Sequence, residues 1–235
     1  MPATLAPPQP SGPTVTAALG ATRTSHRWNE MPGNWDRLNT RMIFASSNPW
    51  GIPDLPTAGG LVEPARLVAY NDRRGCENAG PGSCVHFFLD DYRFETVWTK
   101  PERPLTRLQR VGTALTPDFS LWRDMPLAMQ LWQVYRARWC GAWMAAHGLH
   151  IIPTISWSTP DTFDFAFAGI APESLVAVST VGVRDRDAQA LFAAGYTAML
   201  TALDPVCVLI YGTPPPEDLT AGTPVHVYPS RWAGR

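Results

Sequence analysis

Short apolar runs rich in β-branched residues alternate along this chain with longer segments of helical periodicity. Such alternation is typical of βα units that build a mainly parallel sheet. Eight runs are predicted to be strands, at 41–45, 65–70, 85–89, 112–116, 149–155, 175–181, 206–211 and 225–228.

Apolar residues recur at helical spacing in two long segments. In 125–147 they follow Asp124 as the expected N-cap and Pro126 in the first turn, and Gly148 is the expected stop. The segment 187–203 repeats this scheme and ends at Asp204. Residues 92–98 are predicted to form a short third helix.

These elements predict an α/β fold, specifically a (β/α)8 barrel-like domain. A full barrel usually needs about 250 residues, so this one is expected to be trimmed or distorted. An open, mainly parallel sheet is the alternative. Residues 1–21 are rich in proline and lack periodicity, which predicts a disordered tail, and 22–235 are predicted to form a single domain with an irregular N-terminal segment.

Composition narrows the class of partner. The 235 residues carry 19 Lys and Arg against 20 Asp and Glu, so the chain has almost no net charge. A nucleic-acid partner would therefore need a local patch of positive charge. Neither a membrane-spanning run nor a signal peptide is visible, and we expect a soluble, cytoplasmic protein.

The sequence contains few of the patterns that bind a metal or a cofactor. Its four cysteines include no C-x-x-C pair, which favours free thiols, although Cys76 and Cys84 could close a small loop or lend two metal ligands. No two histidines lie at metal-ligand spacing. We therefore expect no metal, and the absence of P-loop, dinucleotide-binding and nucleophile-elbow motifs favours no cofactor.

Polar residues follow several of the predicted strands. In both architectures ligands bind beyond the carboxyl ends of the strands, whereas a purely structural sheet would be apolar there. The polar set therefore predicts a functional pocket. The candidate substrate-binding residues are Ser120, Thr154, Ser156, Trp157, Ser179, Thr180, Gly182, Tyr211 and Gly212.

The candidate catalytic residues are three aspartates. Side chains alternate along a strand, so only one of Asp90 and Asp91 is expected to face the pocket, and the other could cap the helix that follows. Asp118 could instead hold an Asx-type turn. Two converging carboxylates would suit nucleophilic or acid/base chemistry at a sugar carbon.

Other residues have two interpretations each. Trp157 could stack on a nucleobase or simply plug the end of the barrel. Arg136 and Arg138 lie on the long predicted helix, where they are expected to be solvated or paired rather than to grip a phosphate.

Six segments resemble an uncharacterised domain family of bacteriophages, plasmids and mobile elements, which has no established activity. The resemblance covers about residues 84–213. It rests on VHFFLDDYRFE (85–95), LTPDFSL (115–121), DMPLAMQ (124–130), IPTISWS (152–158), VAVSTVG (176–182) and IYG (210–212).

The order of strand-end signals is more distantly similar to that of the tRNA-guanine transglycosylase superfamily, including its phage DNA 7-deazaguanine branch. Those enzymes are (β/α)8 barrels in which an aspartate attacks the sugar C1′, expels guanine and leaves a covalent intermediate that a deazaguanine captures. The resemblance implies that Asp90 or Asp91 is catalytic and that Asp118 reads or protonates the base.

The same resemblance extends to the base-binding turns. Thr154 and Ser156 would replace the superfamily's base-contacting glutamine, and Ser179 with Gly182 its glycine turn. The chain departs from the pattern by lacking the zinc-binding residues and the late aspartate, for which it offers only Glu217 and Asp218.

The expected function is thus a base-modifying enzyme that exchanges guanine in DNA for a free 7-deazaguanine base. Its partners would be single- or double-stranded DNA and that base. The alternatives are a non-catalytic nucleic-acid- or protein-binding module of a phage or mobile element, and a barrel hydrolase acting on a nucleotide or sugar.

Overall fold

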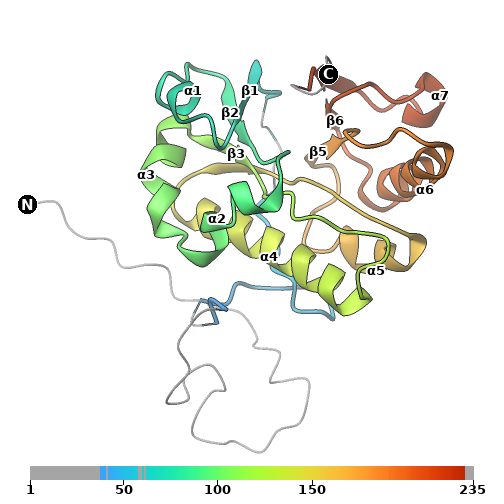
Figure 1. Ribbon diagram of the computed structural model, residues 1–235, viewed down its shortest axis with the longest axis horizontal. Coiled ribbons are helices and arrows are strands. Elements are labelled where there is room, and N and C mark those ends of the chain that lie inside the picture. Colours follow the sequence, from blue (N-terminus) through green and yellow to red (C-terminus); the bar gives the residue numbers. More distant parts are fainter. Residues whose placement is uncertain (1–37, 41, 58–59, 61, 231–235) are drawn as a thin grey trace, which may run out of the picture.

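A computed structural model describes residues 38–40, 42–57, 60 and 62–230, and in them it has an α/β fold with parallel strands (Figure 1). The predicted tail at 1–21 lies outside this part of the chain. The described strands are β1 Arg66–Ala69, β2 Ser83–His86, β3 Thr113–Leu115, β4 His150–Ile152, β5 Leu175–Ser179, β6 Cys207–Tyr211 and β7 Val225–Tyr228.

The strands form two sheets in which sequence neighbours are also spatial neighbours. One sheet has the order β1-β2-β3-β4 and the other β5-β6-β7. A single parallel bridge between Thr154 and Ala177 joins them just beyond β4. A closed barrel is not confirmed, and the alternative of an open parallel sheet fits these two sheets.

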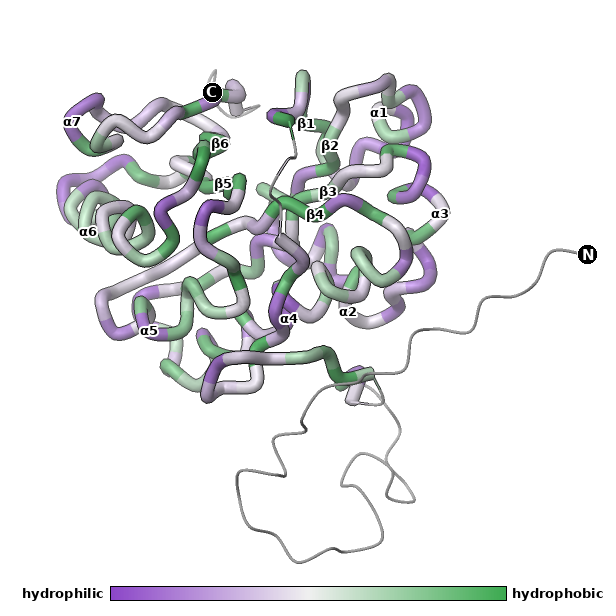
Figure 2. The backbone as a smooth tube through the Cα atoms, turned by 180° about the vertical axis from the view of Figure 1, so that it is seen from behind, coloured by the Kyte–Doolittle hydropathy of each residue, from purple (hydrophilic) through white to green (hydrophobic). Residues whose placement is uncertain are grey.

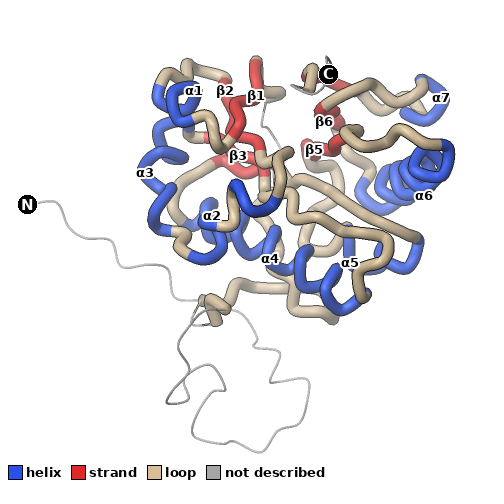
Figure 3. Tube along the Cα trace, viewed as in Figure 1, coloured by secondary structure: helices blue, strands red, loops and turns tan. Residues whose placement is uncertain are grey.

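The helices lie on the outside of the strands (Figures 1 and 3). The short ones are α1 Arg73–Glu77, η3 Asp91–Arg93, α2 Thr96–Thr99, η4 Pro160–Thr162, α5 Phe163–Ala166 and α7 Glu217–Thr220. The longer ones are α3 Glu102–Val111, α4 Leu127–Ala146 and α6 Arg186–Leu203. Figure 2 shows hydrophobic residues along the central strands β4, β5 and β6.

Alternation along the strands divides their side chains between two kinds of core. On one face, residues of both sheets share a single cluster that includes Cys84, Ile152 and Leu209. On the other face, Val85 packs with α1, α3 and α4, and Val208 packs with α6. The strands are therefore covered on both sides, which explains their near-continuous apolar runs.

The long helices begin and end close to their predicted bounds, with one shift. The N-cap of α4 is Pro126 rather than Asp124, because residues 122–125 first form a turn in which Met125 N donates to Trp122 O at 3.1 Å. α6 is capped by Asp185, whose carboxylate accepts from Ala188 N at 2.8 Å. The predicted helix 92–98 is split into η3 and α2.

The strand predicted at 41–45 is wrong, since the described residues 42–45 form no strand. This segment is tied to a helix instead: Trp139 of α4 donates from Nε1 to Met42 O at 2.8 Å, and its ring packs edge-on against Phe44. An apolar extended segment that covers indole rings has the same sequence pattern as a strand.

All four cysteines are buried and free, as the sequence favoured. Cys76 and Cys84 belong to different core clusters. In the part of the chain that the structure describes, no helix combines the length and the apolar composition that a membrane span requires.

Candidate functional site

A pocket of about 580 Å³ opens at the carboxyl ends of β2, β3, β4 and β5. This volume lies in the range of small-molecule sites, about 300–1,000 Å³. The predicted site residues that line it are Asp90, Asp118, Ser120, Ser156, Trp157, Ser179 and Gly182. Four strand ends thus bring seven of the predicted residues to one cavity.

The segment that follows β3 is hydrogen-bonded to the segment that follows β4 through every second residue. Thr116 and Thr154 exchange two hydrogen bonds of 2.8 Å, from Thr154 N to Thr116 Oγ1 and from Thr154 Oγ1 to Thr116 O. Two residues further along each segment, the Ser156 hydroxyl donates to the Asp118 carboxylate. Side chains therefore continue the pairing of β3 and β4 into the pocket.

Asp118 is the carboxylate whose environment is most unusual. Burial raises its pKa to about 6, and the negative charge of Asp91 acts in the same direction, whereas the hydrogen bond from Ser156 opposes the rise. A carboxyl group with a pKa near 6 holds a proton in a useful fraction of molecules at neutral pH, so Asp118 is suited to exchange a proton with a ligand.

The two adjacent aspartates have different surroundings. Asp91 turns toward the β3–α4 loop, where it accepts from Ser120 Oγ at 2.8 Å and from Ser120 N at 3.1 Å. Asp90 lines the pocket, is exposed and pairs with Arg93 at 2.9 Å. Asp90 occupies the N-cap position of η3 but makes no capping hydrogen bond.

Trp157 forms the wall of the pocket on the side of α6. Its Nε1 donates to Leu191 O at 3.2 Å, and the centres of its ring and of the Phe192 ring lie 5.6 Å apart. Gly195 makes this packing possible, because a Cβ there would lie 2.1 Å from the indole Nε1. Trp157 therefore both packs on a helix and offers part of its surface to the cavity.

The remaining predicted residues do not line the cavity. Thr154 is buried in its pairing with Thr116, and Tyr211 is buried and stacks on Phe88 with ring centres 4.9 Å apart. Thr180 donates from Oγ1 to Thr213 O at 2.9 Å. Gly212 has a φ of 128°, and a Cβ there would meet Thr180 Oγ1 at 2.4 Å. Thr180 and Gly212 thus lie where the ends of β5 and β6 meet, outside the cavity.

Sequence reasoning missed several pocket residues, among them members of two segments. Trp122 and Arg123 come from the β3–α4 loop, and Leu191 and Phe192 come from α6. Trp122 is 63% exposed. An aromatic residue and a cation within five residues of Asp118 were a usable signal, whereas the contribution of α6 depends on how that helix packs.

The described residues contain no group of three or more His, Cys, Asp or Glu side chains that could hold a metal ion. The polar groups at the pocket are carboxylates, hydroxyls and the Arg123 guanidinium, and the Trp157 indole forms a wall beside them. This set is suited to proton transfer and to hydrogen bonds with a flat polar ligand.

Comparison with known proteins finds one matching family model and two similar phage proteins. A family model described as "Domain of unknown function (DUF4417)" matches residues 44–229. The chain is 50% identical over 217 residues to the "Gene 1 protein" of Mycobacterium phage D29, covering 91% of this chain and 79% of the phage protein. It is 48% identical over 219 residues to the "Gene 1 protein" of Mycobacterium phage L5, covering 92% and 95%. No solved structure matches the chain.

Proposed function

The chain belongs to the family described as "Domain of unknown function (DUF4417)", and we propose that it is an enzyme that exchanges guanine in DNA for a 7-deazaguanine base. The observation that carries this proposal is that two carboxylates line one pocket. Asp118 has a pKa near neutrality, and Asp90 lines the same cavity from the neighbouring strand end.

The two carboxylates divide the chemistry between them. The Asp90 carboxylate attacks the sugar C1′ as the bond from C1′ to the guanine nitrogen breaks, while protonated Asp118 gives its proton to the departing base. An ester between Asp90 and C1′ remains, and Asp118 is left ionised. This is covalent catalysis assisted by a general acid.

The second half of the exchange reverses these steps with a different base. The 7-deazaguanine nitrogen attacks C1′, its proton passes to the Asp118 carboxylate, and the bond between C1′ and Asp90 breaks. Both aspartates return to their starting states, so no cofactor is consumed.

The surroundings of the pocket give each neighbour a role in this scheme. Asp91 holds the β3–α4 loop through Ser120, so we propose that it positions this loop rather than attacking the sugar. The pocket surface of Trp157 would lie against the flat base. Ser156, Ser179 and Gly182 line the same space and would contact its polar edge.

Three features of the fold support a barrel-like arrangement around this pocket. The strands of each sheet follow one another in chain order, and their inner faces share one core cluster. In addition, Tyr228 at the end of β7 donates from its hydroxyl to Pro64 O, just before β1, at 2.5 Å.

The test is incorporation of labelled guanine or 7-cyano-7-deazaguanine into acid-precipitable DNA by the purified protein. Asp90→Asn and Asp118→Asn should each reduce the rate by at least about a hundredfold, the scale expected for loss of a nucleophile or a general acid. Asp204→Asn, just after α6, is the matched control, because Asp204 is exposed and does not line the pocket. Absence of incorporation with single- or double-stranded DNA and with tRNA would contradict the proposal.

A second candidate is a non-catalytic phage module that binds nucleic acid or a protein. One observation favours it, namely that all three aspartates are already engaged, Asp90 by Arg93, Asp91 by Ser120 and Asp118 by Ser156. Under this alternative DNA binds without incorporation, and the Asp→Asn variants bind as well as the wild type.

A further inference from the structure

Arg138 is a buried cation in the middle of α4 that the proposed chemistry does not use. Its side chain makes three hydrogen bonds, all to backbone carbonyl groups: Nη1 to Thr154 O at 3.0 Å, Nη2 to Ala166 O at 2.9 Å and Nε to Ala168 O at 3.1 Å. The residue is only 2% exposed. Among the described residues, no carboxylate forms an ion pair with it.

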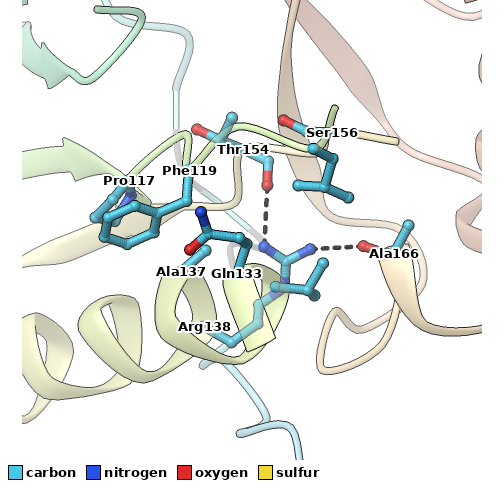
Figure 4. Close-up of a pocket in the computed structure, with 10 residues that line it drawn as sticks. Pro117, Phe119, Gln133, Ala137, Arg138, Thr154, Ser156 and Ala166 are labelled. Carbon is cyan, nitrogen blue, oxygen red and sulfur yellow. Dashed lines mark hydrogen bonds between the residues drawn. The ribbon is translucent and has the colours of Figure 1, made fainter. Parts of the chain in front are cut away.

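These three carbonyls lie at the two ends of one chain segment. Thr154 follows β4, whereas Ala166 and Ala168 lie at the end of α5 and just after it. Residues 155–165 between them carry Ser156 and Trp157 into the pocket. One guanidinium therefore binds both ends of the site segment, as Figure 4 shows for Thr154 and Ala166.

Arginine is suited to this task because its planar group offers five donors in a rigid fork. Lysine presents its three donors from a single atom and cannot span the same acceptors. The guanidinium and Ser156 also line a cavity of about 10 Å³, which they share with Phe119 and Gln133. Such a space holds about one water molecule, so the segment packs closely against Arg138.

We propose that Arg138 is a positioning residue that keeps Ser156 hydrogen-bonded to Asp118. The path is short: Arg138 holds the Thr154 carbonyl, Thr154 is fixed to Thr116, and two residues along the same pair of segments Ser156 donates to Asp118. The inference rests on the proposed function only for the role of Asp118 as an acid.

The test is a carbon-13 NMR titration of the Asp118 carboxyl carbon, assigned with Asp118→Asn. The groups that act on this carboxyl are Ser156, which lowers its pKa, and Asp91, which raises it. Ser156→Ala removes the hydrogen bond and should raise the proton affinity of Asp118 about tenfold. Arg138→Lys keeps the positive charge but loses the forked set of donors, and it should also raise the proton affinity of Asp118.

A double-mutant cycle separates positioning from a general loss of stability. In the Ser156→Ala background, Arg138→Lys should cause no further change in the Asp118 titration. Leu108→Ala, in α3, is the control, because it lowers stability in a core cluster that contains no residue of 155–165, and it should leave the Asp118 midpoint unchanged.

Two results would overturn the proposal. In the first, Asp118 titrates with the wild-type midpoint in Arg138→Lys. In the second, Arg138→Lys shifts the Asp118 midpoint by the same amount in the Ser156→Ala background as in the wild type. If the lysine variant does not fold, Arg138→Gln, which keeps two donors, replaces it in the same cycle. The titration needs no activity, so failure of base exchange and failure of this inference are distinguishable.

Discussion

The Ser156 hydroxyl donates a hydrogen bond to the Asp118 carboxylate, and this bond joins two segments that lie 38 residues apart in the chain. Asp118 remains part-buried beside Asp91, and burial is the main cause of its raised pKa. The relationship makes Asp118 a group whose ionisation changes within the range of pH in which the protein can be studied.

The first prediction concerns stability against pH. An acid with a pKa of about 6 in the folded state and 3.8 in the unfolded state takes up protons on folding between these values. Asp118 therefore makes the free energy of unfolding fall as the pH rises from about 4 to about 6, after which its contribution is constant.

Asp118→Asn removes this contribution. We compare the unfolding free energy of the variant with that of the wild type at each pH. This difference should be about 2 kcal/mol more favourable to the variant at pH 8 than at pH 4. Urea unfolding at both pH values measures the difference. An equal effect of the substitution at both values would show that Asp118 has an ordinary pKa.

The second prediction separates the adjacent aspartates. Asp91→Ala leaves the part-buried backbone N–H of Ser120 without its acceptor, which should cost about 1–3 kcal/mol of stability. Asp90→Ala removes only a surface pair with Arg93 and should cost less than about 1 kcal/mol. Chemical denaturation of both variants makes the comparison, and equal losses would contradict the assignment of Asp91 to the loop.

The third prediction concerns the wall of the pocket. In Gly195→Ala the new methyl group would overlap the Trp157 indole, so overpacking should destabilise the protein by about 1–3 kcal/mol. Gly80→Ala is the control, because a Cβ there meets nothing within 4 Å. Thermal unfolding of the two variants tests this, and a neutral Gly195→Ala would mean that the indole is free to move.

The fourth prediction concerns the thiols. All four cysteines are buried and free, and burial raises the pKa of each, to about 11 for Cys207. Reaction with Ellman's reagent should therefore be slow in the native protein, and four thiols should react after unfolding in guanidinium. A thiol that reacts rapidly in the native protein would contradict this burial.

Local pattern was sufficient for the elements themselves. β-branched runs and helical spacing depend on residues close in sequence, so β5, β6 and α6 lie where the pattern predicts them. The polar positions after the strands were also visible, since parallel strands bring their carboxyl ends to one side. The apolar segment 42–45 misled the same reasoning, because its partner is the indole of Trp139 rather than a strand.

The roles of individual side chains required the tertiary structure, because their partners are distant in sequence. Nothing near Asp91 indicates that it binds Ser120, 29 residues away, while Asp90 lines the pocket. Arg138 has the local pattern of a solvated or paired residue, yet it lies buried against carbonyls 16 to 30 residues away. The sequence alone determined which elements form and at which end the polar groups gather, whereas packing decided which of those groups face the cavity and which hold its walls.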